Sequence, residues 1–177
     1  MELNDKLKKI RAFVFDVDGV LTDGKILAMG DGDLLRQFDA KDAFGLRMAN
    51  MNGYHLGIIT GGRSESIVKR VLSCGVPREN IYLGARDKMV DFRDFCRKNG
   101  LEAEEVMYFG DDIPDLAVVK ACGCGVAPAD AIPDLVAAAD YVSPYGGGNG
   151  CVRHALEMVM RLQDRWQLDV DLYASRF

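Results

Sequence analysis

Short apolar runs alternate with helix-like segments along most of this chain, and this alternation limits the possible folds more than any other feature. The apolar runs lie at residues 11–15, 54–60, 80–83, 106–109, 123–126 and 140–142. Segments with helical spacing, several of them ending at a glycine, lie at 43–51, 64–73, 88–98, 114–121, 133–138 and 152–162. Such a series predicts an α/β fold with a mostly parallel sheet and helices on both faces.

One segment interrupts this alternation. Residues 25–29 and 34–38 are two strand-like runs on either side of Gly30-Asp31-Gly32-Asp33, which predicts a β-hairpin. Because the hairpin follows the first strand directly, we expect a flap at residues 24–39 that projects over the edge of the sheet. A hairpin that mediates contacts between subunits is an equally open interpretation, and the two are compatible.

Composition narrows the class of protein. A chain of 177 residues with 49% hydrophobic and 28% charged residues fits one globular domain. The net charge of −5 argues against nucleic-acid or membrane partners. The sequence has no leader pattern and no apolar run long enough to span a bilayer, and its five cysteines are an odd number. These features predict a cytoplasmic protein with free thiols.

Two carboxylates, Asp16 and Asp18, directly follow the first predicted strand. Such a pair is costly to bury unless a metal or a reaction uses it. The two side chains would converge on one cation if the strand continued, and would diverge if the chain turned at Gly19. In both cases they lie at the edge where open α/β sheets bind ligands. An exposed Asp-Gly turn is the alternative.

Other predicted strands also end in polar groups. Thr60-Gly61-Gly62-Arg63 offers a hydroxyl, backbone N–H groups and a helix start, which suit an anion such as phosphate, although a tight turn would look similar. Gly110-Asp111-Asp112, with Asp115, is a second acidic cluster. Acids at a helix start would explain this cluster alone. Together with Asp16 and Asp18 it predicts a Mg²⁺ site of oxygen ligands.

Lys88 falls in the first turn of a predicted helix, where the helix dipole disfavours a cation. A solvated lysine would tolerate that position at small cost. The functional interpretation is a fixed positive charge directed at a phosphoryl group and at the carboxylates around it.

Four motifs follow one another between residues 13 and 162: Asp16-x-Asp18, Thr60-Gly61, Lys88, and Gly110-Asp111-Asp112 with Asp115. In this order they resemble the haloacid dehalogenase superfamily, which has a Rossmann-like fold. Further segments resemble its small-capped group, which includes the 3-deoxy-D-manno-octulosonate 8-phosphate phosphatases. These segments are residues 16–24, the hairpin, Lys41-Asp42-x-x-Gly45 and Gly147-Gly148-x-Gly150-x-Val152-Arg153. The chain departs from that group at two places. The usual arginine after Thr-Gly is Gly62, with Arg63 one place later, and the usual glutamate after Val-Arg is His154.

The resemblance implies a Mg²⁺-dependent phosphomonoester hydrolase that acts through an aspartyl phosphate. Asp16 would attack phosphorus, while Asp18 would protonate the leaving group and later activate water. Metal ligands would be the Asp16 carboxylate, the Asp18 backbone carbonyl and Asp111. Phosphoryl oxygens would be held by Thr60, the Gly61 N–H and Lys88.

Two further acids have weaker roles in this scheme. Asp112 would orient Lys88 or a metal-bound water. Asp115 would support the metal site, or would only start a helix.

The resemblance also implies a substrate, an assembly and a pathway. The expected substrate is 3-deoxy-D-manno-octulosonate 8-phosphate, in lipopolysaccharide biosynthesis, and the alternative is a nine-carbon sugar-acid 9-phosphate. Arg63, Lys41 and Arg86 are candidates for binding the substrate carboxylate, although each also fits an ordinary surface charge. Members of this group are typically tetramers, so we expect a homotetramer.

Three rival functions fit the sequence less well. A phosphomutase of the same superfamily would need a larger cap than this chain can form. A receiver-like, non-enzymatic phospho-acceptor would carry its acceptor after a middle strand, where Tyr82-Leu83-Gly84 has no aspartate. A nucleotide-binding module would need a G-x-G-x-x-G register, which residues 146–150 lack.

The chain is expected to form a phosphatase domain at residues 1–165 and a tail at 166–177. In the tail, Trp166, Leu168, Val170 and Leu172 alternate with polar residues, which predicts an extended segment lying on another surface. That surface is either the chain's own domain or a neighbouring subunit, where Arg176 would bring a cation to the pocket.

Overall fold

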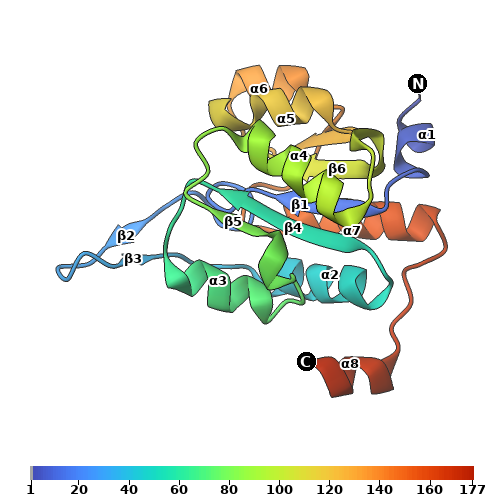
Figure 1. The fold of residues 1–177 in the computed structure, drawn as a ribbon, viewed down its shortest axis with the longest axis horizontal. Coiled ribbons are helices and arrows are strands. Elements are labelled where there is room, and N and C mark those ends of the chain that lie inside the picture. The colour runs from blue at the N-terminus through green and yellow to red at the C-terminus, as the bar shows by residue number, and fades with distance from the viewer. Residues whose placement is uncertain (1) are drawn as a thin grey trace.

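The computed structural model describes residues 2–177, and within them six strands form one sheet in which every pair is parallel (Figure 1). The strand order is β5-β4-β1-β6-β7-β8. The strands are β1 (Ala12–Phe15), β4 (His55–Thr60), β5 (Ile81–Leu83), β6 (Val106–Phe109), β7 (Cys124–Ala127) and β8 (Tyr141–Val142). The predicted parallel sheet is therefore confirmed, and the predicted boundaries of these six strands lie within one residue of the observed ones.

The predicted helices are also present. They are α2 (Ala40–Met51), α3 (Glu65–Leu72), α4 (Lys88–Asn99), α5 (Leu116–Ala121), α6 (Pro133–Ala138) and α7 (Cys151–Leu162). Three single turns of 3-10 helix, η1 (Arg78–Asn80), η2 (Ala103–Glu105) and η3 (Ile113–Asp115), precede β5, β6 and α5. The sequence did not predict α1 (Leu3–Leu7). Helix α2 begins earlier than predicted because the Asp39 side chain accepts hydrogen bonds from the N–H groups of Lys41 and Asp42.

Helices cover both faces of the sheet, as predicted. Along β1, Phe13 and Phe15 pack into one apolar cluster with residues of α2, α3 and α7. Ala12 and Val14 face the opposite way, into a second cluster with residues of α4, α5 and α6. All four side chains are fully buried, so the strand is a continuous apolar run with no alternation.

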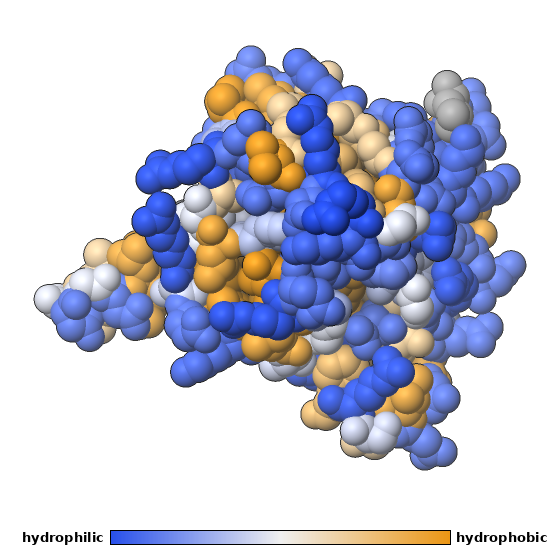
Figure 2. All heavy atoms as spheres, in the orientation of Figure 1, coloured by the Kyte–Doolittle hydropathy of each residue, from blue (hydrophilic) through white to orange (hydrophobic). Residues whose placement is uncertain are grey.

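The hairpin is present and consists of β2 (Leu27–Ala28) and β3 (Leu34–Leu35), paired antiparallel. It extends outward from the body of the molecule (Figure 1), and the predicted hairpin after the first strand is confirmed. Its exposed apolar side chains are Ile26, Leu27, Met29, Leu34 and Leu35. Figure 2 shows this projection carrying apolar residues among polar ones. A two-stranded ribbon of this kind is marginally stable alone.

The tail differs from the prediction, because its last residues form a helix, α8 (Val170–Arg176). The helix begins where the Asp169 side chain accepts a hydrogen bond from the N–H of Leu172 at 2.9 Å. It lies against α2 of the same chain, where Nη1 of Arg47 donates to Oη of Tyr173 at 2.9 Å. Of the four alternating apolar residues, Trp166 and Leu168 lie in the non-helical stretch before α8, whereas Val170 and Leu172 lie in the helix, where the expected extended segment is wrong.

In the part of the chain that the structure describes, no helix combines the length and the apolar character that crossing a bilayer requires.

Candidate active site

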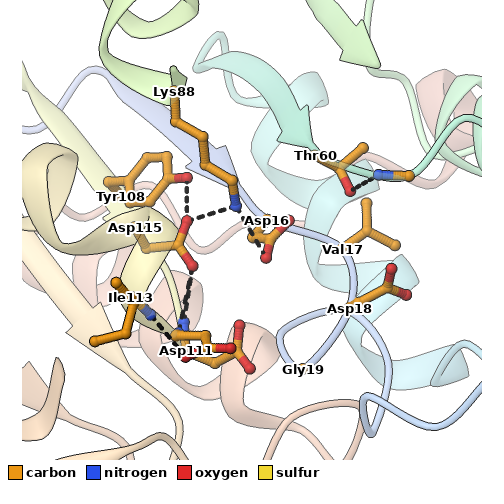
Figure 3. A network of polar contacts seen from close by, with 12 residues as sticks. Asp16, Val17, Asp18, Gly19, Thr60, Lys88, Tyr108, Asp111, Ile113 and Asp115 are labelled. Carbon is orange, nitrogen blue, oxygen red and sulfur yellow. Dashed lines mark hydrogen bonds and ion pairs between the residues drawn. The ribbon is translucent and has the colours of Figure 1, made fainter. Parts of the chain in front are cut away.

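The chain leaves β1 at Phe15 and turns, so that Asp16 and Asp18 diverge (Figure 3). Asp16 points into a cluster with Lys88 and Asp111, whereas the Asp18 carboxylate is directed away from that cluster. The turn passes through Gly19 in the left-handed region, at φ +89°. A Cβ at this position would also overlap the Asp111 carboxylate. Glycine is therefore needed both for the turn and for the approach of the second acidic loop.

Lys88 is the first residue of α4 and its side chain is only 5% exposed. Its Nζ lies 3.1 Å from Oδ2 of Asp16 and 2.7 Å from Oδ1 of Asp115. Burial alone would lower the pKa of Lys88, but the two carboxylates outweigh it and raise that pKa. They also offset the unfavourable helix dipole. The result is a permanent positive charge beside Asp16.

Asp115 is fully buried and connects several parts of the site. Its Oδ1 accepts hydrogen bonds from Lys88 and from Oη of Tyr108, the latter at 2.7 Å, and its Oδ2 accepts from the N–H of Asp111 at 3.2 Å. Burial, together with the charge of Asp115, raises the pKa of Tyr108 well above its usual range, so this hydroxyl remains a donor. Asp115 thereby fixes Lys88 relative to the loop after β6.

Lys88 contacts Asp16 and Asp115 and not Asp112, so of the two roles expected for Asp112 only the orientation of a metal-bound water stays a prediction. The Asp112 side chain accepts a hydrogen bond from the N–H of Ile113 at 2.7 Å and caps η3. The residue that orients Lys88 is Asp115, which was expected only as a supporting acid. Spacing could not separate these two aspartates, because they lie at the two ends of the same single turn, η3.

Asp16, Asp111 and Asp115 form a compact acidic group. One carboxylate oxygen from each lies within 4.8 Å of the others. Within residues 2–177, Oδ1 of Asp111 is buried and has no hydrogen-bond partner. Burial, followed by the charges of Asp16 and Asp115, raises the pKa of Asp111 to about 7. Burial and Asp115 also raise the pKa of Asp16 to about 7, although Lys88 opposes the shift. An unpartnered oxygen among repelling carboxylates is the arrangement that a divalent cation fits.

Thr60 ends β4 and is buried at the opposite side of the pocket from Asp115. Its Oγ1 accepts a hydrogen bond from the N–H of Gly62 at 3.1 Å, which leaves the hydroxyl proton available to another acceptor. A pocket of about 320 Å³ brings the predicted residues together. Its lining includes Asp16, Asp18, Thr60, Gly61, Lys88, Asp111, Asp112 and Asp115.

The candidate carboxylate-binding residues are not brought into this pocket. Arg63 and Arg86 are exposed in the loops after β4 and β5. Lys41 lines a separate groove, with Arg153 and His154 among its neighbours. Nε2 of His154 lies 2.8 Å from Oη of Tyr141. Contacts of Arg63 and Lys41 with a substrate therefore stay predictions.

The Lys41-Asp42 motif contacts the glycine-rich loop at residues 146–150, and this loop in turn packs against the turn after β1. Asp42 is buried and accepts hydrogen bonds from the N–H groups of Gly150, at 3.3 Å, and Arg153, at 2.7 Å, where α7 begins. A Cβ at Gly147 would overlap the backbone of Gly19. The glycine-rich loop thus packs against the protein's own backbone, which is contrary to the use of its glycines as a nucleotide-binding loop.

Sequence reasoning missed two residues of the site. Tyr108 is the polar member of an apolar strand, and a buried hydroxyl needs a partner, which was a usable signal. Arg36 is the arginine of the hairpin region. Its Nε donates to Oδ1 of Asp18 at 2.6 Å and its Nη2 to Oδ2 at 3.1 Å. No spacing rule linked Arg36 to Asp18, because the path of the hairpin decides that contact.

Comparison with known proteins agrees with this geometry. Residues 79–155 match the family model of haloacid dehalogenase-like hydrolases. The chain is 36% identical over 160 residues to the 3-deoxy-D-manno-octulosonate 8-phosphate phosphatase of Escherichia coli K12, covering 90% of this chain and 84% of that protein.

Solved structures are similar over nearly the whole chain. The Yersinia pestis 3-deoxy-D-manno-octulosonate 8-phosphate phosphatase matches with a TM-score of 0.89 and 33% identity, covering 93% of this chain and 88% of that one. The Moraxella catarrhalis phosphatase, solved with magnesium, phosphate and the sugar acid, matches with a TM-score of 0.88 and 32% identity, covering 97% and 95%.

The fold and the acidic site, together with these similarities, define a haloacid dehalogenase-like hydrolase. Within that class, the chain belongs to the family of the 3-deoxy-D-manno-octulosonate 8-phosphate phosphatases.

Proposed function

We propose that this protein hydrolyses 3-deoxy-D-manno-octulosonate 8-phosphate to the free sugar acid and phosphate, with Mg²⁺ as cofactor. The observation that carries the proposal is the position of the Asp16 carboxylate, between the buried ammonium of Lys88 and the unpartnered oxygen of Asp111. This arrangement suits an anionic nucleophile that must approach an anionic phosphate. The family relationship supplies the choice of substrate.

The reaction takes place in two steps. An Asp16 oxygen attacks phosphorus, the bond from phosphorus to the sugar oxygen breaks, and Asp18 donates a proton to the leaving oxygen. Asp18 then takes a proton from a water molecule that attacks the aspartyl phosphate, and the bond between phosphorus and Asp16 breaks to release phosphate. Lys88 and the Thr60 hydroxyl hold phosphoryl oxygens in both steps.

The Asp16 carboxylate, the Asp111 carboxylate and the Asp18 backbone carbonyl would hold Mg²⁺, which supplies charge that screens the nucleophile from the phosphate. Asp115 is not assigned as a ligand, because its oxygens are engaged by Lys88, Tyr108 and the Asp111 backbone. Its role in this scheme is to keep Lys88 in place.

We also propose a homotetramer assembled through the β2–β3 hairpin. Five exposed apolar side chains on and beside a two-stranded ribbon form an apolar surface, and burying that surface between subunits would be favourable. The cytoplasm is the proposed compartment, because the five cysteines are free and buried.

Steady-state kinetics test the substrate. We expect kcat/KM for 3-deoxy-D-manno-octulosonate 8-phosphate to exceed that for a nine-carbon sugar-acid 9-phosphate, and both activities to disappear in excess chelator. A higher value for the nine-carbon compound would contradict the substrate but leave the reaction class standing. Full activity without a divalent cation would contradict the mechanism.

A further inference from the structure

Arg36, one residue beyond β3, is the place where the hairpin meets the site. Its side chain is 3% exposed, while that of Asp18 is 28% exposed. The buried partner of this ion pair is therefore the arginine of the hairpin, and the carboxylate that it holds lies at the wall of the pocket.

The contact fixes the orientation of the Asp18 carboxylate. Nε and Nη2 of Arg36 bind the two carboxylate oxygens separately, at 2.6 Å and 3.1 Å. Nη1 donates to the backbone oxygen of Leu34 at 3.1 Å, which ties the guanidinium to β3. A planar fork that binds both oxygens sets the plane of the carboxylate as well as its position.

Gly62 makes room for Arg36 beside the loop after β4, where residues 60–63 are predicted to bind phosphate. A Cβ at position 62 would lie 3.3 Å from Nη2 of Arg36 and 2.7 Å from Cδ1 of Ile67. The guanidinium therefore lies between Asp18 and the loop after β4, at the place where the sequence departs from its group by having glycine.

We propose that Arg36 is a positioning residue that holds Asp18 in the orientation required for proton transfer. This inference rests on the role of Asp18 as acid and base in the proposed function. A proton donor acts only within hydrogen-bond reach of the leaving oxygen, so a freely rotating Asp18 would transfer protons less often. Through this contact the hairpin takes part in the chemistry although its tip is remote from the pocket.

A double-mutant cycle tests the proposal, with the sugar-acid 8-phosphate as substrate. Arg36→Ala should lower kcat about tenfold or more and change KM less than kcat, because general acid–base catalysis contributes about 10²–10⁴ in rate. In an Asp18→Asn background the same change should cost less than about twofold, since Arg36 then has no acid to position. Arg36→Lys, which keeps the charge but loses the fork, should fall between Arg36→Ala and the wild type.

Lys25→Ala is the matched control, because it removes a cation of the same hairpin region whose ion-pair partner is the exposed Asp23. It should leave kcat unchanged, and thermal unfolding should show that all variants are folded. An equal loss of kcat from Arg36→Ala in both backgrounds would overturn the proposal, since Arg36 would then act on the substrate directly. No loss in the wild-type background would also overturn it.

A second measurement decides the question if Asp18→Asn has no measurable turnover. With p-nitrophenyl phosphate, the leaving group needs no proton, so the burst of p-nitrophenolate should be equally fast in wild type and Arg36→Ala. A slower burst in the variant would contradict positioning through Asp18. Failure of the proposed function would look different, because the wild-type protein itself would then not hydrolyse the sugar phosphate.

Discussion

Lys88 and Asp16 are in direct contact, with Nζ of the lysine 3.1 Å from Oδ2 of the aspartate. The two residues come from the start of α4 and the end of β1, and Asp115, after β6, binds the same ammonium. Three separate segments are therefore joined at one buried charge. Removing a member of such a group leaves the others buried and uncompensated, which is strongly destabilising.

Tyr108 should affect the rate through this group. Tyr108→Phe removes the hydroxyl that donates to Asp115, so Asp115 and Lys88 lose part of their restraint. We expect kcat to fall several-fold with little change in KM, and the free energy of unfolding to fall by about 1 kcal/mol. Steady-state kinetics and urea unfolding measure the two effects.

The control for this variant is Tyr82→Phe, which removes a tyrosine hydroxyl that donates to Asp94 away from the site. It should leave kcat unchanged. An unaltered kcat in Tyr108→Phe would show that the hydroxyl does not restrain the catalytic lysine.

Asp111 should be required for metal binding. Asp111→Ala removes the buried oxygen that has no protein partner, and a Mg²⁺ site with few carboxylates cannot spare one. Calorimetric titration should show that Mg²⁺ binding is lost, whereas Asp134→Ala, an exposed acid in the first turn of α6, should bind Mg²⁺ normally. Wild-type affinity in Asp111→Ala would contradict this assignment.

Metal binding should depend on pH. In the cation-free protein the pKa values of Asp16 and Asp111 are raised to about 7, chiefly by burial. These carboxyls bind more protons when folded than when unfolded, so their contribution to stability is present at low pH and is lost as pH rises from about 4 to about 7. Mg²⁺ competes with those protons, so its apparent affinity should increase over the same range.

Thermal unfolding with and without Mg²⁺ measures this effect. The increase in Tm caused by a fixed Mg²⁺ concentration should be larger at pH 8 than at pH 5.5, since ligand binding to the folded state raises stability. An increase that is the same at both pH values would count against titration of these two acids.

Local sequence predicted the sheet well because β1 and its neighbours are continuous apolar runs bounded by glycine and acidic residues. It also indicated that Asp16 and Thr60 lie close together, since the ends of parallel strands meet at one edge, and it singled out Lys88 because a helix start disfavours a cation. It did not predict the contact between Arg36 and Asp18, nor that Lys88 contacts Asp115 and not Asp112. Both contacts depend on how loops pack in three dimensions.

The tail was misjudged for a related reason. Four apolar residues in alternation suggested an extended segment, but the capping side chain of Asp169 and the contact between Tyr173 and Arg47 favour a helix. Tertiary contacts decided this short segment, as they often do where intrinsic propensity is weak.

Deleting residues 166–177 should raise KM more than it lowers kcat and should weaken assembly, if the tail shapes a neighbouring pocket. Tyr173→Ala is a useful companion variant, because it loses the contact with α2 but keeps the whole tail. Light scattering and kinetics measure both properties. An unchanged oligomeric state together with an unchanged KM in the truncated protein would exclude a role of the tail in assembly and substrate binding.

The proposed mechanism depends on Asp16 as the nucleophile, and Asp16→Asn tests this role most directly. The amide is nearly the same size as the carboxylate but carries no negative charge to attack phosphorus. The measurement is the rate of phosphate release from 3-deoxy-D-manno-octulosonate 8-phosphate with saturating Mg²⁺, on protein shown to be folded by thermal unfolding. We predict no detectable turnover in Asp16→Asn, and activity above a few per cent of the wild-type rate would contradict an aspartyl-phosphate mechanism at this residue.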